Sequence, residues 1–242
     1  MFRRLSFVFV ISMIFAAGAQ AQHFDVFVAT SGTETVGGGV DVDTGAVVPG
    51  QQIFEAEVGD IFGIFSADEP GFNHPADDTI LPPGVDSLAD GVEIFVTGLD
   101  VTTAGSTAPL FFWDGTGTPS FAPAAATFTI NTGNTTGSIG ATGAGGGFDD
   151  HPFYEISAGA SLPELGIYLA AFDVTVDGFS ASGPNYLVLG TEGLVPTDDE
   201  LEELIELGVG YVETNIIPEP SAFSLAGIGL LVMLMRRRSS RQ

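Results

Sequence analysis

Short apolar runs recur about every ten residues through the middle of the chain, and segments rich in Gly, Thr and Ser separate them. Many of these runs alternate apolar with polar positions or hold β-branched and aromatic residues, which is typical of strands. About ten strands are predicted, which favours an all-β fold, a β-sandwich of Ig-like or jelly-roll-like type. They cover residues 24–28, 39–48 as two strands turning at 43–45, 53–57, 60–65, 92–96, 109–115, 126–130, 153–156, 166–176 and 185–189.

Two long segments interrupt this pattern. Residues 66–91 are rich in Pro and Asp, and residues 131–147 are of low complexity in Gly, Thr and Ala. Both exceed the length of ordinary connections, and such segments tend to be functional or flexible loops. We therefore expect loops at both places.

One short helix is expected near the C-terminal end of the domain, over residues 197–207. Thr197 and Glu200 have the spacing of a capping box, and Gly208 suits the position just after a helix. Its apolar positions share one face, which should pack on the strands. Residues 211–217 are then expected as a last strand or a spacer.

The first 21 residues have the pattern of a secretory signal peptide. Arg3 and Arg4 form a basic region, residues 5–15 are apolar, and residues 17–21 offer two overlapping A-x-A cleavage sites. Cleavage after Ala21 is expected, with retention as an N-terminal anchor as the alternative.

Residues 216–242 hold three features in a fixed order: Pro218, Glu219 and Pro220, then an uncharged run over 221–235, then Arg236, Arg237 and Arg238. This order closely resembles the PEP-CTERM sorting signal of Gram-negative and related bacteria. The resemblance implies export, recognition by an exosortase at the inner membrane, and release or attachment at the cell surface or in an extracellular matrix. It also implies a setting in which an exopolysaccharide matrix is a candidate partner.

The length of the uncharged run fits that interpretation. A helix over residues 221–235 would span roughly 22 Å, short of the ~30 Å hydrocarbon core of a bilayer. The arginines that follow would stay in the cytoplasm under the positive-inside rule. We expect a transmembrane sorting helix that is inserted transiently, and a permanent single-pass anchor is the alternative.

These signals divide the chain into a signal peptide (1–21), one ectodomain (22–215) and the sorting signal (216–242). The ectodomain has the size of one sandwich domain. Because the chain has no cysteine, an exported domain must here be held together by its core or by ions.

Charge is the most unusual property of the ectodomain. All six Lys and Arg residues are arginines in the two terminal signals, whereas all of the 31 acidic residues except Glu219 lie between Asp25 and Glu213. Ion pairs with Lys or Arg are therefore impossible within the ectodomain, and nucleic-acid binding is not expected. Self-repulsion that weakens with ionic strength predicts a domain adapted to salty or calcium-containing surroundings.

Each of the three histidines lies beside carboxylates, and two of these groups form the candidate metal site: His74 with Asp77 and Asp78, and His151 with Asp149. Imidazole with carboxylate suits zinc or another first-row cation. In a chain this acidic, solvated turn residues are the alternative.

Calcium is the second candidate ion, because hard oxygen ligands are abundant. The run that begins Asp41-x-Asp43 departs from an EF-hand at its sixth and twelfth positions, which favours a plain hairpin turn there. Scattered loop carboxylates could still bridge calcium: Asp68, Glu69, Asp77, Asp78 and Asp86.

Residues 148–190, with their aromatic strands at 153–156, 166–176 and 185–189, also resemble the end of a β-rich surface domain in bacterial exported proteins with interchangeable C-terminal anchors. Some of those relatives are under zinc-responsive control. They tend to have a His-x-His pair before the first aromatic strand, and here Asp149 replaces the first histidine.

No catalytic motif for a nucleophile elbow, a zinc protease, a P-loop or a dinucleotide site occurs. The leading hypothesis is an exported structural or adhesive protein that is not an enzyme. The alternatives are a divalent-cation or carbohydrate binding module, and a polysaccharide hydrolase using two spaced carboxylates. Trp113 could stack on a sugar, although aromatic residues in a strand are more often core.

Overall fold

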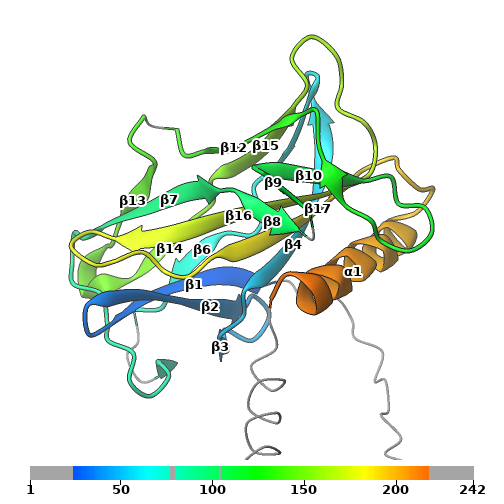
Figure 1. The fold of residues 1–242 in the computed structure, drawn as a ribbon. Helices are drawn as coiled ribbons and strands as arrows, with labels where there is room; N and C mark the ends of the chain where they lie inside the picture. Colours follow the sequence, from blue (N-terminus) through cyan, green and yellow to red (C-terminus); the bar gives the residue numbers. More distant parts are fainter. Residues whose placement is uncertain (1–23, 77–79, 104, 134, 218–242) are drawn as a thin grey trace, which may run out of the picture.

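A computed structural model describes residues 24–76, 80–103, 105–133 and 135–217 (Figure 1). The signal peptide over 1–21, Asp77, Asp78 and the sorting signal from Pro218 onward lie outside the described residues. Within the described part of the chain, no helix is long and apolar enough to cross a membrane.

The described residues form mostly β-strands, with one α-helix near the end. The elements are β1 (Phe24–Ser31), β2 (Glu34–Asp41), β3 (Val47–Pro49), β4 (Ile53–Ile61), β5 (Ile64–Ala67), β6 (Phe72–His74), β7 (Glu93–Leu99), β8 (Val101–Thr103), β9 (Ser106–Ala108), β10 (Leu110–Trp113), β11 (Ala122–Pro123), β12 (Thr127–Asn131), β13 (Ser138–Ala141), the 3₁₀ turn η2 (Ala144–Gly146), β14 (Phe148–Asp150), β15 (Phe153–Ser157), β16 (Ile167–Val176), β17 (Asn185–Thr191) and α1 (Asp198–Asn215).

The strands form two main sheets. A 5-stranded sheet has the order β14-β6-β1-β2-β3. A 10-stranded sheet runs β11-β10-β16-β17-β4-β5-β15-β12, with β7 joined to β16 and β13 joined to β7. Most pairs are antiparallel, but β1 pairs with β6 and β17 with β4 in parallel, so these contacts join segments far apart in the sequence.

The central strands of the larger sheet are buried on both faces, which explains their nearly continuous apolar sequence. Successive residues of β16 point to opposite faces of the sheet. Tyr168, Ala170 and Phe172 therefore join the core shared with β1, whereas Ile167, Leu169 and Ala171 join the core shared with α1. The result is three layers: the smaller sheet, the larger sheet and the helix (Figure 1).

Helix α1 begins where the sequence predicts and ends later. The Thr197 side chain accepts a hydrogen bond from the Glu200 backbone N–H, as an N-cap residue does. The helix does not stop at Gly208 but continues to Asn215. A Cβ at Gly208 would lie 2.9 Å from Val188 Cγ1, so this glycine allows close packing on β17 and is not a cap.

The all-β prediction is confirmed at the level of the class, and the Ig-like or jelly-roll-like type stays a prediction. The number of strands is larger than expected because short pieces pair within the expected loops: β6 in 66–91 and β13 in 131–147. The two strands expected over 53–65 are instead one long strand, β4, and a hairpin that turns at 62–63 into β5.

Candidate metal centre

The register of three neighbouring strands brings distant residues to one point. β1 and β6 pair in parallel with Val26 opposite Phe72, and β6 and β14 pair antiparallel with Asp150 opposite Phe72. One step further along each strand, Asp25, Gly71 and His151 must therefore lie side by side. The Val26 N–H donates to the Gly71 carbonyl at 2.8 Å, which fixes this end of the pairing.

The backbone N–H of Gly71 donates hydrogen bonds to two carboxylates. Its N–H donates to Asp25 Oδ1 at 2.9 Å and to Glu69 Oε2 at 3.1 Å. Asp25 is only 7% exposed, so one carboxylate of this pair is buried. Each carboxylate has a second oxygen, and that of Glu69, Oε1, lies 3.5 Å from His151 Nδ1.

The His151 ring completes the cluster. Asp25, Glu69 and His151 each offer one ligand atom, and these atoms all lie within 4.8 Å of one another, the one such group of three among the described residues. The ring packs directly over Gly71, where a Cβ would lie 2.5 Å from His151 Cε1. A glycine is required at position 71 to leave room for the imidazole.

The hydrogen bonds of the ring select its metal-binding nitrogen. His151 Nδ1 lies 3.1 Å from the Asp68 carbonyl oxygen and 3.5 Å from Glu69 Oε1; because the carbonyl oxygen can only accept, Nδ1 carries the proton. In a neutral ring Nε2 is then the atom with the lone pair. A backbone carbonyl that fixes the tautomer in this way is the usual outer partner of a metal-binding histidine.

Asp149 faces this nitrogen, with its Oδ1 at 3.4 Å from His151 Nε2. Two lone-pair donors that face each other need a proton or a metal ion between them. The spacing of 3.4 Å is that of an ion pair with a protonated ring, and it also places Asp149 where it can stand beside an ion bound by the imidazole. Calcium prefers six to eight oxygens at longer distances, which this cluster offers less well.

Both Glu69 and His151 have a raised pKa, Glu69 mainly through burial and His151 through its hydrogen bond and the charges around it. Burial raises the pKa of Glu69, and the charges of Asp25 and Asp68 raise it further against the opposing effects of His151 and the Gly71 N–H. Burial alone would lower the pKa of His151. The hydrogen bond to Asp68 and the charges of Glu69, Asp25 and Asp149 outweigh that effect, so its pKa is raised. Without a cation, the cluster therefore attracts protons.

Tyr154 contacts the segment that carries the cluster residue Glu69. It is fully buried, and its hydroxyl donates to the Pro70 carbonyl at 2.9 Å, which holds the segment that carries Glu69. Burial, with the charges of Glu69 and Asp25, raises the pKa of Tyr154 well above its ordinary value. The tyrosine therefore stays neutral and acts as a positioning residue.

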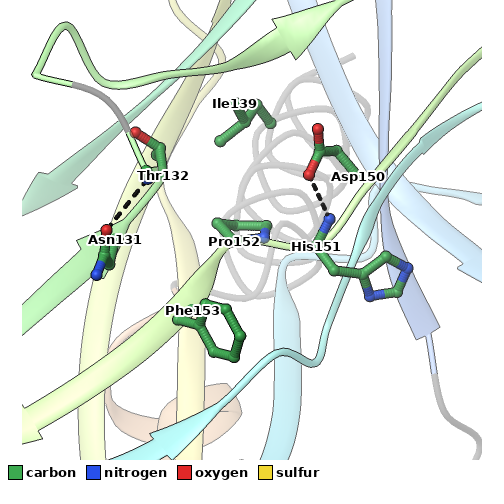
Figure 2. Close-up of a pocket in the computed structure, with 8 residues that line it drawn as sticks. Asn131, Thr132, Ile139, Asp150, His151, Pro152 and Phe153 are labelled. Carbon is green, nitrogen blue, oxygen red and sulfur yellow. Dashed lines mark hydrogen bonds between the residues drawn. The ribbon is translucent and has the colours of Figure 1, made fainter.

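Two cavities adjoin His151. The smaller, of about 310 Å³, is lined by Asn131, Ile139, Pro152 and Phe153, and Figure 2 shows the ring of His151 pointing away from Ile139 and Phe153. The larger, of about 560 Å³, has the three groups of the cluster and Asp149 in its wall. The imidazole therefore belongs to the larger cavity.

The structure brings together part of the set predicted from sequence. Asp149 and His151 meet as expected, whereas Asp77 and Asp78 lie outside the described residues. His74 is 1% exposed; its Nδ1 lies 2.7 Å from the Val28 carbonyl oxygen and its Nε2 accepts from the Leu88 N–H. With both nitrogens bonded to backbone groups, His74 is a core residue and not a member of the cluster.

Two further candidates are structural. Asp41 Oδ1 accepts hydrogen bonds from the N–H groups of Asp43 and Thr44, so this segment is a hairpin turn. Trp113 is buried, and its indole N–H donates to the Thr116 carbonyl, so it belongs to the core and not to a sugar-stacking surface.

Asp25 and Glu69 were the members that sequence reasoning did not group with His151. Their only signals were the proximity of Asp25 to His23 and the place of Glu69 among the loop carboxylates. Their sequence separation from His151 hides the contact, because it depends on the pairing of β1, β6 and β14.

Comparison with known proteins addresses the segment beyond α1. No curated protein matches the chain. Residues 217–239 match the family model described as the PEP-CTERM protein-sorting motif, as the sequence predicted. The chain is therefore an exported protein that carries a PEP-CTERM sorting motif, is recognised by an exosortase and the export machinery, and is handled at the cell envelope.

Proposed function

We propose that this exported protein acts by binding and not by catalysis, and that its β domain holds one zinc-like divalent cation through Asp25, Glu69 and His151, with Asp149 beside the imidazole. The observation that carries the proposal is the convergence of these ligand atoms within 4.8 Å around a buried carboxylate. No Lys or Arg occurs between residues 5 and 235, so only a cation from outside or a proton can neutralise the cluster.

The cation has a structural role in this proposal. It joins the start of β1, the loop before β6 and the end of β14, which are three separate parts of the smaller sheet. A bound ion that closes long segments of chain stabilises a fold in the way that a disulfide does. A cysteine-free exported domain gains by this means a cross-link suited to a structural or adhesive role at the cell surface or in the extracellular matrix.

The test is calorimetric titration of the full chain, freed of metal with a chelator, with Zn²⁺ and separately with Ca²⁺ at high NaCl concentration. We expect one Zn²⁺ per chain, tighter than Ca²⁺. Asp25→Asn keeps the acceptor for the Gly71 N–H and should weaken Zn²⁺ binding at least tenfold, by analogy with the loss of supporting groups at metal sites. Asp177→Asn, far from the cluster in sequence and at an exposed position, serves as the matched control.

Two results would count against the proposal. One is the absence of saturable Zn²⁺ binding. The other is equal Zn²⁺ affinity in the wild type and in Asp25→Asn, which would mean that zinc binds to scattered surface carboxylates.

A further inference from the structure

Much of the lining of the larger cavity outside the cluster is apolar, and part of it faces solvent. Besides the cluster and Asp149, the cavity of about 560 Å³ is lined by Val40, Asp41, Val42, Gly45, Asn73, Pro75 and Ile80. Val42 is 51% exposed and Ile80 47% exposed, so apolar side chains face solvent beside a group of carboxylates. The volume lies within the range of about 300–1,000 Å³ that is usual for small-molecule sites.

An ion in this cluster would have coordination positions directed to the cavity. Three protein ligands leave one position of a tetrahedral ion open, and more positions of a five- or six-coordinate ion. An oxygen atom of a ligand in the cavity can take such a position. The ion is then a bridge between the protein and the ligand.

The charges around the cavity define the ligand's chemistry. An anionic ligand would meet the repulsion of a chain with formal net charge −25, and no Lys or Arg of the ectodomain could bind it. Hydroxyl groups suit the site, because they coordinate a cation through oxygen and donate hydrogen bonds to carboxylates. Asn73 adds an amide that can donate and accept, and the C–H face of a sugar ring fits the apolar wall.

We propose that the larger cavity binds a neutral, hydroxyl-rich ligand, a sugar unit of an uncharged saccharide, through the cation held by Asp25, Glu69 and His151. This inference rests on the proposed function, since the cation is one of the ligand's partners. Val42 forms the apolar wall, and Asn73 and Asp149 provide hydrogen bonds.

The experiment is calorimetric titration of the Zn²⁺-loaded full chain with three probes: the hexasaccharides of mannose, glucose and galactose. We expect at least one to bind saturably, and we expect that binding to vanish when EDTA removes the ion. Val42→Ser should weaken saccharide binding about tenfold with Zn²⁺ affinity unchanged, as expected for lost apolar contact in a pocket. Val48→Ser is the matched control, because Val48 is an exposed valine in β3, the strand that follows the turn holding Val42, and lies outside the cavity lining.

The outcomes separate the two proposals. Zn²⁺ binding without binding of any of the three saccharides overturns the ligand inference and leaves the metal site standing. Equal saccharide binding with EDTA also overturns it, because the ion is then no bridge. Absence of Zn²⁺ binding overturns both. A thermal unfolding curve of Val42→Ser like that of the wild type shows that the variant is folded.

Discussion

Gly71→Ala is the substitution that tests the geometry of the metal centre most sharply. The new Cβ would lie 2.5, 2.7 and 2.8 Å from Cε1, Nε2 and Nδ1 of His151. Ordinary contacts begin near 3.4 Å, so the ring would have to retreat by about 0.9 Å. Metal–ligand distances tolerate only about 0.2 Å. The imidazole would therefore no longer reach an ion held by Asp25 and Glu69.

The cost to the fold should be small by comparison. Gly71 is not among the glycines with positive φ, and the His151 side chain is 38% exposed, so the ring can swing toward solvent. We expect the free energy of unfolding without metal to change by less than about 1 kcal/mol, whereas Zn²⁺ affinity should fall about 10- to 100-fold. Titration calorimetry measures the affinity, and thermal unfolding with EDTA measures the stability.

Gly98→Ala is the matched control, because a Cβ at Gly98 in β7 would meet nothing within 4 Å. It should leave both quantities near their wild-type values. Wild-type Zn²⁺ affinity in Gly71→Ala would refute the reasoning, since it would show that the His151 ring over Gly71 is not part of the site.

Four further results are expected. Phe62 is 103% exposed and has φ 56° at a hairpin turn, so Phe62→Asn should stabilise the fold by about 0.5–1 kcal/mol and raise Tm by about 1–4 °C, as scanning calorimetry can measure. Thr197→Ala removes the N-cap of α1 and should cost about 1 kcal/mol in urea unfolding. In EDTA, the folded protein loses stability as the pH rises above 4.5, because the pKa of Glu69 is raised and its ionisation is unfavourable in the fold. The pKa of His151 is also raised, so the stability that its charge contributes is full below pH 6.5 and is lost as the pH rises through its folded-state pKa. Tm in EDTA should therefore fall from pH 5 to pH 8, Zn²⁺ should restore it at pH 8, and a rise in Tm over that interval would contradict the pKa directions. Added NaCl should raise Tm of the metal-free protein, and a constant Tm would show that self-repulsion is unimportant.

The fold could be predicted from the sequence where the apolar pattern is strong. β16 and β17 were expected nearly at their observed bounds, because strands buried on both faces leave continuous apolar runs. The start of α1 was recognisable from Thr197 and Glu200. The end of α1 was not recognisable, because a glycine at position 208 is compatible both with a helix cap and with close packing of the helix on β17.

The short strands and the pairing between distant strands could not be predicted from the sequence. β6 and β13 have three and four residues, too few for a periodic signal, and they exist because neighbouring strands pair with them. The parallel pairing of β1 with β6 has no local pattern either. The pairing of β1, β6 and β14 also brings Asp25 and Gly71 to His151, so the sequence alone could group only Asp149 with His151.

In the candidate site too, contacts between sequence neighbours could be predicted and contacts between distant residues could not. Asp149 and His151 are two residues apart, and their proximity was visible in the sequence. Asp25 joins them only through the register of β1, β6 and β14. His74 was a plausible partner by composition, but the burial of the third residue of β6 directs its ring into the core beside Phe27.

The central claim is that a divalent ion lies between Asp25, Glu69 and His151. Anomalous diffraction at the zinc absorption edge from crystals grown with Zn²⁺ tests it most directly. We expect one strong peak about 2.0–2.2 Å from a ligand atom of each of these three residues. Strong peaks only at other carboxylates, with none in this cluster, would contradict it.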